Sequence, residues 1–233
     1  IYKDFSKKKY TISKKKKSNY RNLLLKKRFN YCVKDNFRNF KKIKILEIGC
    51  GSGEFLKILK KKKIFYKGLE VDKNQINVAK KSNLNVSNDK IDNETNTSYD
   101  LILMFDVFEH VVDPLKYLKK IYQKLKKNGL LICYMPNINS ISFEFMRENN
   151  NLIYPFEHLN FFNEKSIKFI SRKTKFQIKK LETFGLDMID YFFYKEFTDK
   201  KKYFKFILKE IDILQKYIDE HNLGNHYRLT LKK

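Results

Sequence analysis

One stretch constrains this chain most: an apolar run that leads into alternating glycines and then into an amphipathic segment. Residues 42–50 read KIKILEIGC, a short apolar run of the kind found in buried parallel strands. Residues 51–62 open with glycine and continue with apolar side chains at helical spacing. Glycines permit a tight turn there and let a ligand approach the backbone closely. The pattern predicts a strand, a ligand-accessible turn and a helix.

The same alternation of strand and helix continues along the chain. Further strands are predicted at 65–71, 84–88, 99–107, 130–136 and 176–184, with a final edge strand at 226–233. Helices are predicted at 72–83, 114–127, 139–148, 164–173 and 199–221. Asp72 is the expected N-cap of one helix, Pro114 suits the first position of the next, and Asn128-Gly129 is its expected end. The fold class is therefore α/β, a mostly parallel seven-stranded sheet that is doubly wound, with helices on both faces.

Two acids flank the glycine turn at positions where they could hold a ligand. Glu47 stands just before the glycines, which suits a cationic group and not a phosphate. Glu70 ends the second predicted strand, and a carboxylate there can accept both hydroxyls of a ribose. The alternative for Glu70 is a solvated acid at a strand end. The glycine spacing differs from the G-x-G-x-x-G of dinucleotide-binding proteins.

The biased composition weakens the positive net charge as a sign of a nucleic-acid or membrane partner. Of 233 residues, 51 are Lys or Arg and 26 are Asp or Glu, a net charge of +25, yet only six are arginine. Proteins that grip phosphates usually use Arg as well, so AT-rich coding explains most of the lysine. Cys32, Cys50 and Cys133 are far apart and form no C-x-x-C pair, which fits a reducing cytoplasm without disulfides. No apolar run is long enough to span a bilayer and no signal peptide is visible.

The N-terminal segment, residues 1–41, is expected to be a basic amphipathic helical appendage to a domain at 42–233. Residues 1–42 alone carry a net charge of +14. Their apolar residues recur at roughly helical spacing, at Leu23, Leu24, Leu25, Phe29, Cys32, Val33, Phe37 and Phe40. Such a segment could lie on anionic lipid or RNA, or dock its apolar side on the domain while its lysines face water.

Several segments in order resemble the class I S-adenosylmethionine-dependent methyltransferases. LEIGCGSGEF (46–55) is similar to their first motif and GLEVDKNQINVAK (68–80) to their second. Residues 98–137 resemble the stretch that holds a hydrophobic strand, a Glu-His pair, Asp-Pro, a helix and a strand ending in Pro-Asn. PFEHLNFFNEKSI (155–167) resembles a segment of the ubiquinone-biosynthesis and glycan-pathway O-methyltransferases. The resemblance covers about 42–185 and implies a Rossmann-like fold.

The resemblance also implies which residues contact S-adenosylmethionine. The amino-acid end of this cofactor would lie at Glu47, Gly49, Cys50, Gly51 and Gly53, and the ribose at Glu70 and Val71. Asn88 and Asp89 would lie near the adenine, and Phe105 and Asp106 would form the floor. The segment 88–98 is polar and carries the weakest of these assignments.

A second cluster suggests where the chemistry takes place. Relatives carry an acid-x-x-Glu-His array that supports a divalent cation, which implies Asp106, Glu109 and His110 as ligands of Mg²⁺ or of a borderline metal. The alternative is that Glu109 and His110 only fix the loop. His110 and His158 are candidate bases, because imidazole titrates near neutrality. His158 lies in an aromatic segment that could cover an acceptor, within a helical cover at about 138–173.

The function expected from these residues is methyl transfer to a hydroxyl of a small molecule, such as a sugar, a lipid-linked precursor or a quinone-like phenol. The basic N-terminal segment would then bring a cytoplasmic enzyme to a membrane surface. An RNA or protein methyltransferase is the alternative, against which stands the absence of an Asn/Asp-Pro-Pro-Tyr/Phe motif after the strand at 99–107. A binding module that keeps the fold without catalysis is the third reading.

Overall fold

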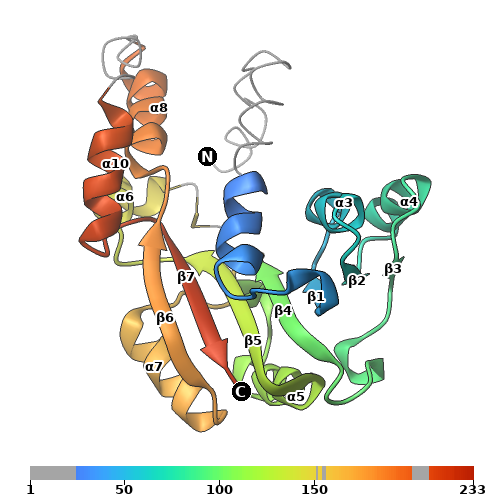
Figure 1. Cartoon of the computed structure of the whole chain (residues 1–233). Helices are drawn as coiled ribbons and strands as arrows, with labels where there is room; N and C mark the ends of the chain where they lie inside the picture. Colours follow the sequence, from blue (N-terminus) through green and yellow to red (C-terminus); the bar gives the residue numbers. More distant parts are fainter. Residues whose placement is uncertain (1–24, 151, 154–155, 201–209) are drawn as a thin grey trace.

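The computed structural model describes residues 25–150, 152–153, 156–200 and 210–233. A seven-stranded sheet in the order β3-β2-β1-β4-β5-β7-β6 forms its centre (Figure 1). The strands are β1 Lys44–Ile48, β2 Phe65–Leu69, β3 Val86–Ser87, β4 Tyr99–Phe105, β5 Leu125–Pro136, β6 Gln177–Phe184 and β7 His226–Lys232. The predicted α/β class with a mostly parallel seven-stranded sheet is confirmed.

The direction of the strands changes only at β7. β1 pairs in parallel with β2 and β4, and β4 pairs in parallel with β5. β7 runs antiparallel to both of its neighbours, β5 and β6. The prediction of an edge strand at 226–233 is therefore wrong, because β7 lies inside the sheet and β6 forms the edge. This insertion carries His226 to a position opposite Pro136 and Phe184.

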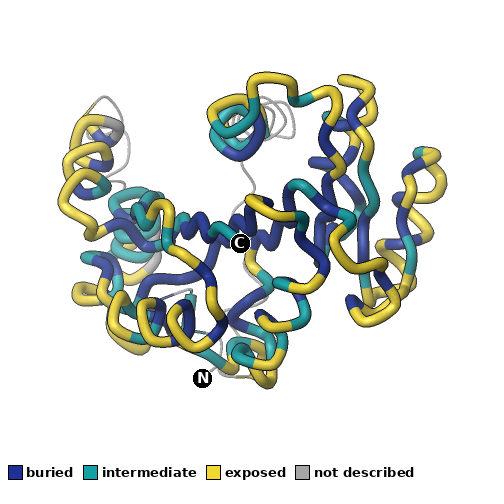
Figure 2. Tube along the Cα trace, turned by 60° about the horizontal axis from the view of Figure 1, so that its bottom comes forward, coloured by how far each residue is buried: buried dark blue, intermediate teal, exposed yellow. Residues whose placement is uncertain are grey.

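Helices cover both faces of the sheet, as the pattern predicts. On one face Leu118 and Ile121 of α5 (Pro114–Lys124) and Ile167 of α7 (Glu164–Lys173) are fully buried. On the other face α3 (Glu54–Lys61) contributes Leu56 and α4 (Lys73–Lys81) contributes Ala79 to a second core cluster. Figure 2 shows the result: burial follows the strands, while the helices turn exposed sides outward.

Local capping signals place several helix starts correctly. The side chain of Asp72 accepts a hydrogen bond from Asn74 N and begins α4, as expected. Asp113 accepts from Lys116 N, and Pro114 takes the first position of α5. Asn163 forms a capping box at the start of α7. These bonds satisfy N–H groups that the first turn leaves without partners.

Two stretches differ from the predicted elements. α5 ends at Lys124, not near 127, because Leu125 already pairs with Tyr99 as the first residue of β5. The end signal Asn128-Gly129 thus lies within β5, where Asn128 has a φ of 62°. In place of one helix at 199–221, the described residues form α8 (Asp187–Asp199) and α10 (Ile211–Glu220). Both stand with α6 (Ile141–Met146) beyond the arrowhead of β6, at the upper left of Figure 1.

The described part of the basic N-terminal segment packs on the sheet. Residues 25–34 are helical, with a π-helical turn η1 at Asn30–Lys34. Phe29, Cys32 and Val33 are buried in the same core cluster as α3 and α4. These side chains dock on the domain, whereas residues 1–24, with Leu23 and Leu24, lie outside the described residues. Within the described ranges, every helix is too short or too polar to cross a lipid bilayer.

Candidate functional site

A hollow of about 600 Å³ opens where the first strands end in the glycine turn. Ligands of open α/β sheets bind at this position, outside the carboxyl ends of the strands. Seven of the eleven predicted cofactor residues line it: Glu47, Gly49, Cys50, Gly51, Glu70, Phe105 and Asp106. The sequence prediction and the cavity therefore coincide around β1, β2 and β4.

The glycine turn is fixed by backbone bonds and leaves one position open. Gly49 N and Cys50 N both donate to Leu69 O, at 2.8 and 3.1 Å, which ties the turn to β2. Gly51 has a φ of 53°, and a Cβ added there would meet nothing within 4 Å. Space beside a left-handed glycine is what a ligand needs in order to reach the backbone.

Glu70 lies at the rim of the hollow and is bonded to the turn. Its Oε2 accepts from Gly51 N at 2.7 Å, and its Oε1 accepts from Val71 N and Asp72 N at 2.7 and 2.9 Å. Three backbone donors thus orient one carboxylate between the turn and the end of β2. This arrangement does not match a freely solvated acid.

Glu47 is a buried carboxyl group with an unmet hydrogen-bonding requirement. Its side chain lines the hollow, the residue is 4% exposed, and Oε2 has no hydrogen-bond partner. Burial raises the pKa of Glu47 to about 8, against the opposing effect of Arg28. Since a buried polar atom without a partner is costly, this oxygen suits a cationic donor supplied by a ligand.

Arg28 is a site residue that the motifs did not reveal. Its guanidinium lies over the Phe105 ring, 4.1 Å from the centroid, and it lines the same hollow. The ring of Phe105 also contacts Phe55 and Tyr134 edge-on. A hint was present in the sequence: an arginine beside Phe29 is conspicuous in a chain with 45 lysines and six arginines.

Four predicted cofactor residues do not line the hollow. Gly53 is the N-cap of α3, and a Cβ there would come within 2.4 Å of Leu84. The side chain of Val71 is 85% exposed. Asn88 and Asp89 are exposed beyond β3, where Asn88 donates to Val71 O at 3.0 Å. Their contacts with a ligand stay predictions.

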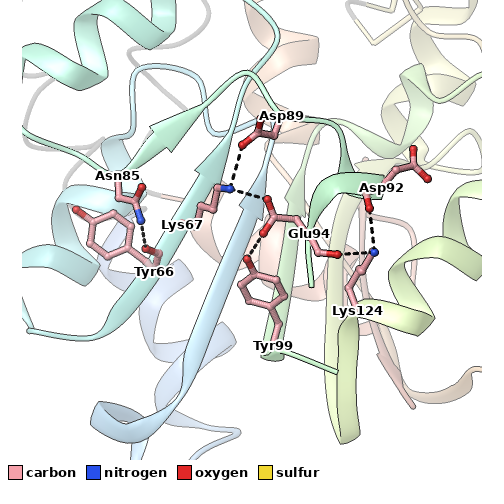
Figure 3. Close-up of polar contacts among 8 residues, drawn as sticks. All are labelled: Tyr66, Lys67, Asn85, Asp89, Asp92, Glu94, Tyr99 and Lys124. Atoms are coloured by element: carbon pink, nitrogen blue, oxygen red, sulfur yellow. Dashed lines mark hydrogen bonds and ion pairs between the residues drawn. The ribbon is translucent and has the colours of Figure 1, made fainter. Parts of the chain in front are cut away.

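A polar network that is buried at Glu94, Tyr99 and Lys124 fixes the segment after β3 (Figure 3). Lys67 Nζ donates to Asp89 Oδ2 at 3.1 Å and to Glu94 Oε1 at 2.7 Å, and the Tyr99 hydroxyl donates to Glu94. Lys124 Nζ, also buried, donates to the backbone oxygen of Glu94. Although its sequence is polar, this segment is therefore held by side chains of β2, β4 and α5.

A second polar cluster forms beside the hollow, where η4 (Phe108–His110) meets residues 157–160. Leu159 N and Asn160 N each donate to Glu109 O at 2.9 Å. His110 Nδ1 lies 2.6 Å from Glu157 O, and the His110 and His158 ring centroids are 4.9 Å apart. The Glu109-His110 pair and the aromatic segment around His158 thus lie together, although about fifty residues separate them in the sequence.

The donor set of this second cluster differs from the predicted one. Glu109, His110 and His158 offer ligand atoms that lie within 4.8 Å of one another, and Glu109 Oε2 is buried without a partner. Burial raises the pKa of Glu109 to about 8. Asp106 is not in this group; its Oδ1 lies 3.7 Å from His226 Nε2. Two imidazoles and one carboxylate suit a borderline metal better than Mg²⁺.

One family model and several curated proteins match this chain in sequence. The family model described as "Methyltransferase domain" matches residues 18–181. A ubiquinone biosynthesis O-methyltransferase of Cereibacter sphaeroides is 33% identical over 113 residues, 45% of each chain, and one of Pelagibacter ubique is 26% identical over 174 residues, 69% of this chain and 72% of the relative. The chain thus aligns with about half the length of the first of these curated relatives.

Solved structures share the fold. A SAM-dependent methyltransferase from Archaeoglobus fulgidus superimposes with a TM-score of 0.63 at 22% identity, covering 91% of this chain and 94% of the other. A Haemonchus contortus phosphoethanolamine N-methyltransferase 2 in complex with S-adenosyl-L-methionine gives 0.54 at 19% identity, covering 91% of this chain and 51% of the other. At these identities the likeness concerns the fold.

Proposed function

The chain belongs to the class I S-adenosylmethionine-dependent methyltransferases, and from this premise we propose that it methylates a hydroxyl of a small molecule. The observation that supports the cofactor part of this proposal is the buried, unpartnered Glu47 oxygen at the glycine turn, with Glu70 lining the same hollow. The hydroxyl acceptor is proposed from the relatives named O-methyltransferase. S-adenosylmethionine, the cofactor of this family, has a cationic ammonium for the first acid and ribose hydroxyls for the second.

Each part of the hollow has a proposed task toward this cofactor. Glu47 accepts the ammonium, the open side of Gly51 receives the amino-acid end, and Glu70 takes the ribose hydroxyls. Arg28, above Phe105, lies where it would pair with the cofactor carboxylate. The sulfonium supplies an activated methyl group, so the protein has only to align donor and acceptor and to remove a proton.

The acceptor is proposed to lie beyond Asp106, toward Glu109, His110 and His158. The relatives named O-methyltransferase favour a hydroxyl, and a quinone-like phenol, a sugar and a lipid-linked precursor are its candidate bearers. A divalent cation held by Glu109, His110 and His158 would polarise such a hydroxyl. Catalytic roles for His110 and His158 stay predictions, as do membrane contact through residues 1–42 and a cytoplasmic location.

A titration followed by a transfer assay tests the proposal. We expect S-adenosylhomocysteine to bind the wild type with micromolar affinity and Glu70→Gln at least tenfold more weakly. Glu164→Gln makes the same change on α7, where the exposed Glu164 side chain pairs with Lys168 one turn away, and serves as the control. Mass spectrometry then follows a methyl group from S-adenosylmethionine onto catechol, protocatechuate or methyl glucoside.

Two outcomes would contradict this function. Failure of the wild type to bind S-adenosylhomocysteine would overturn the cofactor site and favour a binding module. Binding with transfer to RNA or to protein, and to none of the hydroxyl probes, would favour the alternative class of methyltransferase.

A further inference from the structure

A histidine that no sequence motif singled out lies next to the cofactor hollow. His226 is the first residue of β7, and it reaches the end of β4 because β7 inserts between β5 and β6. Its Nε2 is 3.7 Å from Oδ1 of Asp106, which lines the hollow. Asp106 has a φ of 55°, a left-handed conformation that is uncommon outside glycine. Asp106 therefore carries backbone strain at a position where it contacts both the hollow and His226.

The neighbouring amide defines which ring nitrogen of His226 carries hydrogen. Asn225 Nδ2 donates to Asp190 Oδ2 at 3.0 Å, so the amide nitrogen faces the carboxylate and Oδ1 faces the opposite way. Oδ1 lies 2.8 Å from His226 Nδ1. Since an amide oxygen can only accept, Nδ1 is the protonated nitrogen, and Nε2 of the neutral ring keeps its lone pair.

Asn225 itself is held in place from several sides. It is 1% exposed, its N donates to Asp187 Oδ2 at 2.9 Å, and its O accepts from Asn137 N at 2.8 Å. A Cβ added at Gly185 would come within 2.2 Å of Asn225 Oδ1, so a glycine is what allows the amide to occupy this position. These contacts fix the Asn225 amide and, through it, the orientation of the His226 ring.

His226 differs from the other histidines in this respect. All four histidines lie in the described ranges, and Nδ1 of His110, His158 and His221 faces a backbone carbonyl, whereas Nδ1 of His226 faces a side chain. A hydrogen bond at one ring nitrogen determines the protonation of the other, and at His226 this bond depends on a side chain that can be replaced by mutation.

The charge around His226 favours a neutral ring that can take up a proton. Burial lowers the pKa of His226. The charged and titratable groups that act on the ring come from several elements: Asp106 and Asp187 favour the protonated form, while Arg28 and His158 disfavour it. The two acids would stabilise the imidazolium once it forms.

We propose that His226 accepts the proton of the acceptor hydroxyl through Nε2 during methyl transfer, with Asn225 as its positioning residue. This inference rests on the proposed O-methyltransferase function. The acceptor oxygen forms a bond to the methyl carbon while the bond from sulfur to that carbon breaks. Sulfur keeps the electron pair and becomes a neutral thioether, the hydroxyl proton passes to Nε2, and the imidazolium later releases it to water.

The ring tautomer can be measured without any acceptor. Long-range ¹H–¹⁵N NMR spectra of the protein saturated with S-adenosylhomocysteine should show His226 protonated at Nδ1. Gly185→Ala, which displaces the Asn225 amide, should yield a mixture of tautomers, while the surface control His221→Gln leaves the His226 signals unchanged. A wild-type ring protonated at Nε2 would overturn the assignment.

Kinetics with catechol as the probe acceptor test the proton transfer. His226→Gln should bind S-adenosylhomocysteine within about twofold of the wild type, which shows that it folds, and lose at least 100-fold in kcat. Asn225→Ala should lose about tenfold and shift the acidic limb of the pH–kcat profile. His221→Gln should match the wild type.

The outcomes separate this inference from the function on which it rests. Wild-type turnover that His226→Gln preserves would overturn the role of His226 alone. Wild-type binding of S-adenosylhomocysteine without methylation of any hydroxyl probe would overturn the O-methyltransferase function, and the proton-accepting role with it.

Discussion

Replacing Glu47 with glutamine is expected to stabilise the fold and to weaken cofactor binding at the same time. The residue is 4% exposed, and one of its carboxyl oxygens has no partner. Burial raises the pKa of Glu47 from 4.5 to about 8; Arg28 opposes this rise and Glu70 adds to it. Glutamine has nearly the same shape and cannot ionise.

The expected gain in stability follows from proton linkage. Between pH 4.5 and about 8 the folded protein keeps a proton on Glu47 that the unfolded chain has lost, so the free energy of unfolding falls as the pH rises through this range. The full difference corresponds to at most roughly 5 kcal/mol. Because Glu47 lines a hollow that is open to solvent, part of this difference is screened, and we expect Glu47→Gln to be about 2 kcal/mol more stable than the wild type at pH 8 and equal to it at pH 4.

The expected loss in binding follows from the same carboxyl group. Ammonium binding requires ionised Glu47, so the wild type should release a proton on binding below pH 8, and its affinity should rise with pH toward that value. A hydrogen bond to a charged group contributes about 1.5–3 kcal/mol. Glu47→Gln should therefore bind S-adenosylhomocysteine about 10- to 100-fold more weakly at pH 8.

Urea unfolding at pH 4 and pH 8 measures the first effect, and calorimetry in two buffers of different ionisation enthalpy measures the proton release. Glu164→Gln, exposed on α7, should change neither. A Glu47→Gln protein that is less stable than the wild type at pH 8, or that binds equally well, would refute the reasoning from burial.

The remaining predictions concern the network, the glycine turn and the second cluster. In urea unfolding, Lys124→Met should lower the free energy of unfolding by about 2–3 kcal/mol, because Nζ is buried against several oxygens. Lys120→Met removes an exposed ion pair and should lower it by less than about 1 kcal/mol. Equal losses in the two variants would contradict this contrast. Gly51→Ala should cost about 1 kcal/mol of stability and weaken S-adenosylhomocysteine binding. Gly49→Ala should be less stable than Gly51→Ala, since its Cβ would come within 2.3 Å of a valine side chain. Thermal melts of both variants with and without ligand test these two expectations. Zn²⁺ should raise the melting temperature more than Mg²⁺ does, and His158→Ala should abolish the difference; an equal response to both ions would argue against the donor set.

The glycine turn and the acids beside it could be predicted from the sequence because these residues are close together in the chain. Gly49, Gly51 and Glu47 stand within five residues at the end of one strand, and Asp72 caps the helix that follows Glu70. Backbone conformation and strand direction place such neighbours on the same edge of a parallel sheet wherever the strands pair. Alternation of apolar strands and amphipathic helices likewise determined the fold class.

Other features arose only from pairing over long distances. Leu125 belongs to β5 and not to α5 because Tyr99 pairs with it, and Arg28 joins the site because Phe29, Cys32 and Val33 dock on the sheet. Helical spacing near residue 28 indicated an amphipathic helix, yet it could not tell whether lipid, RNA or the domain would cover its apolar side.

His226 illustrates the division most clearly. Its segment alternates like any strand, and the sequence alone determined that 226–233 would be extended. Only the tertiary structure decided that β7 enters the sheet antiparallel, between β5 and β6, and so brings His226 beside Asp106, 120 residues earlier in the chain. Local periodicity specifies which residues form a strand. Which strands become its neighbours depends on burying both faces of the strand and on hydrogen-bonding the backbone groups along both of its edges. These requirements involve the whole chain, so only the tertiary structure meets them.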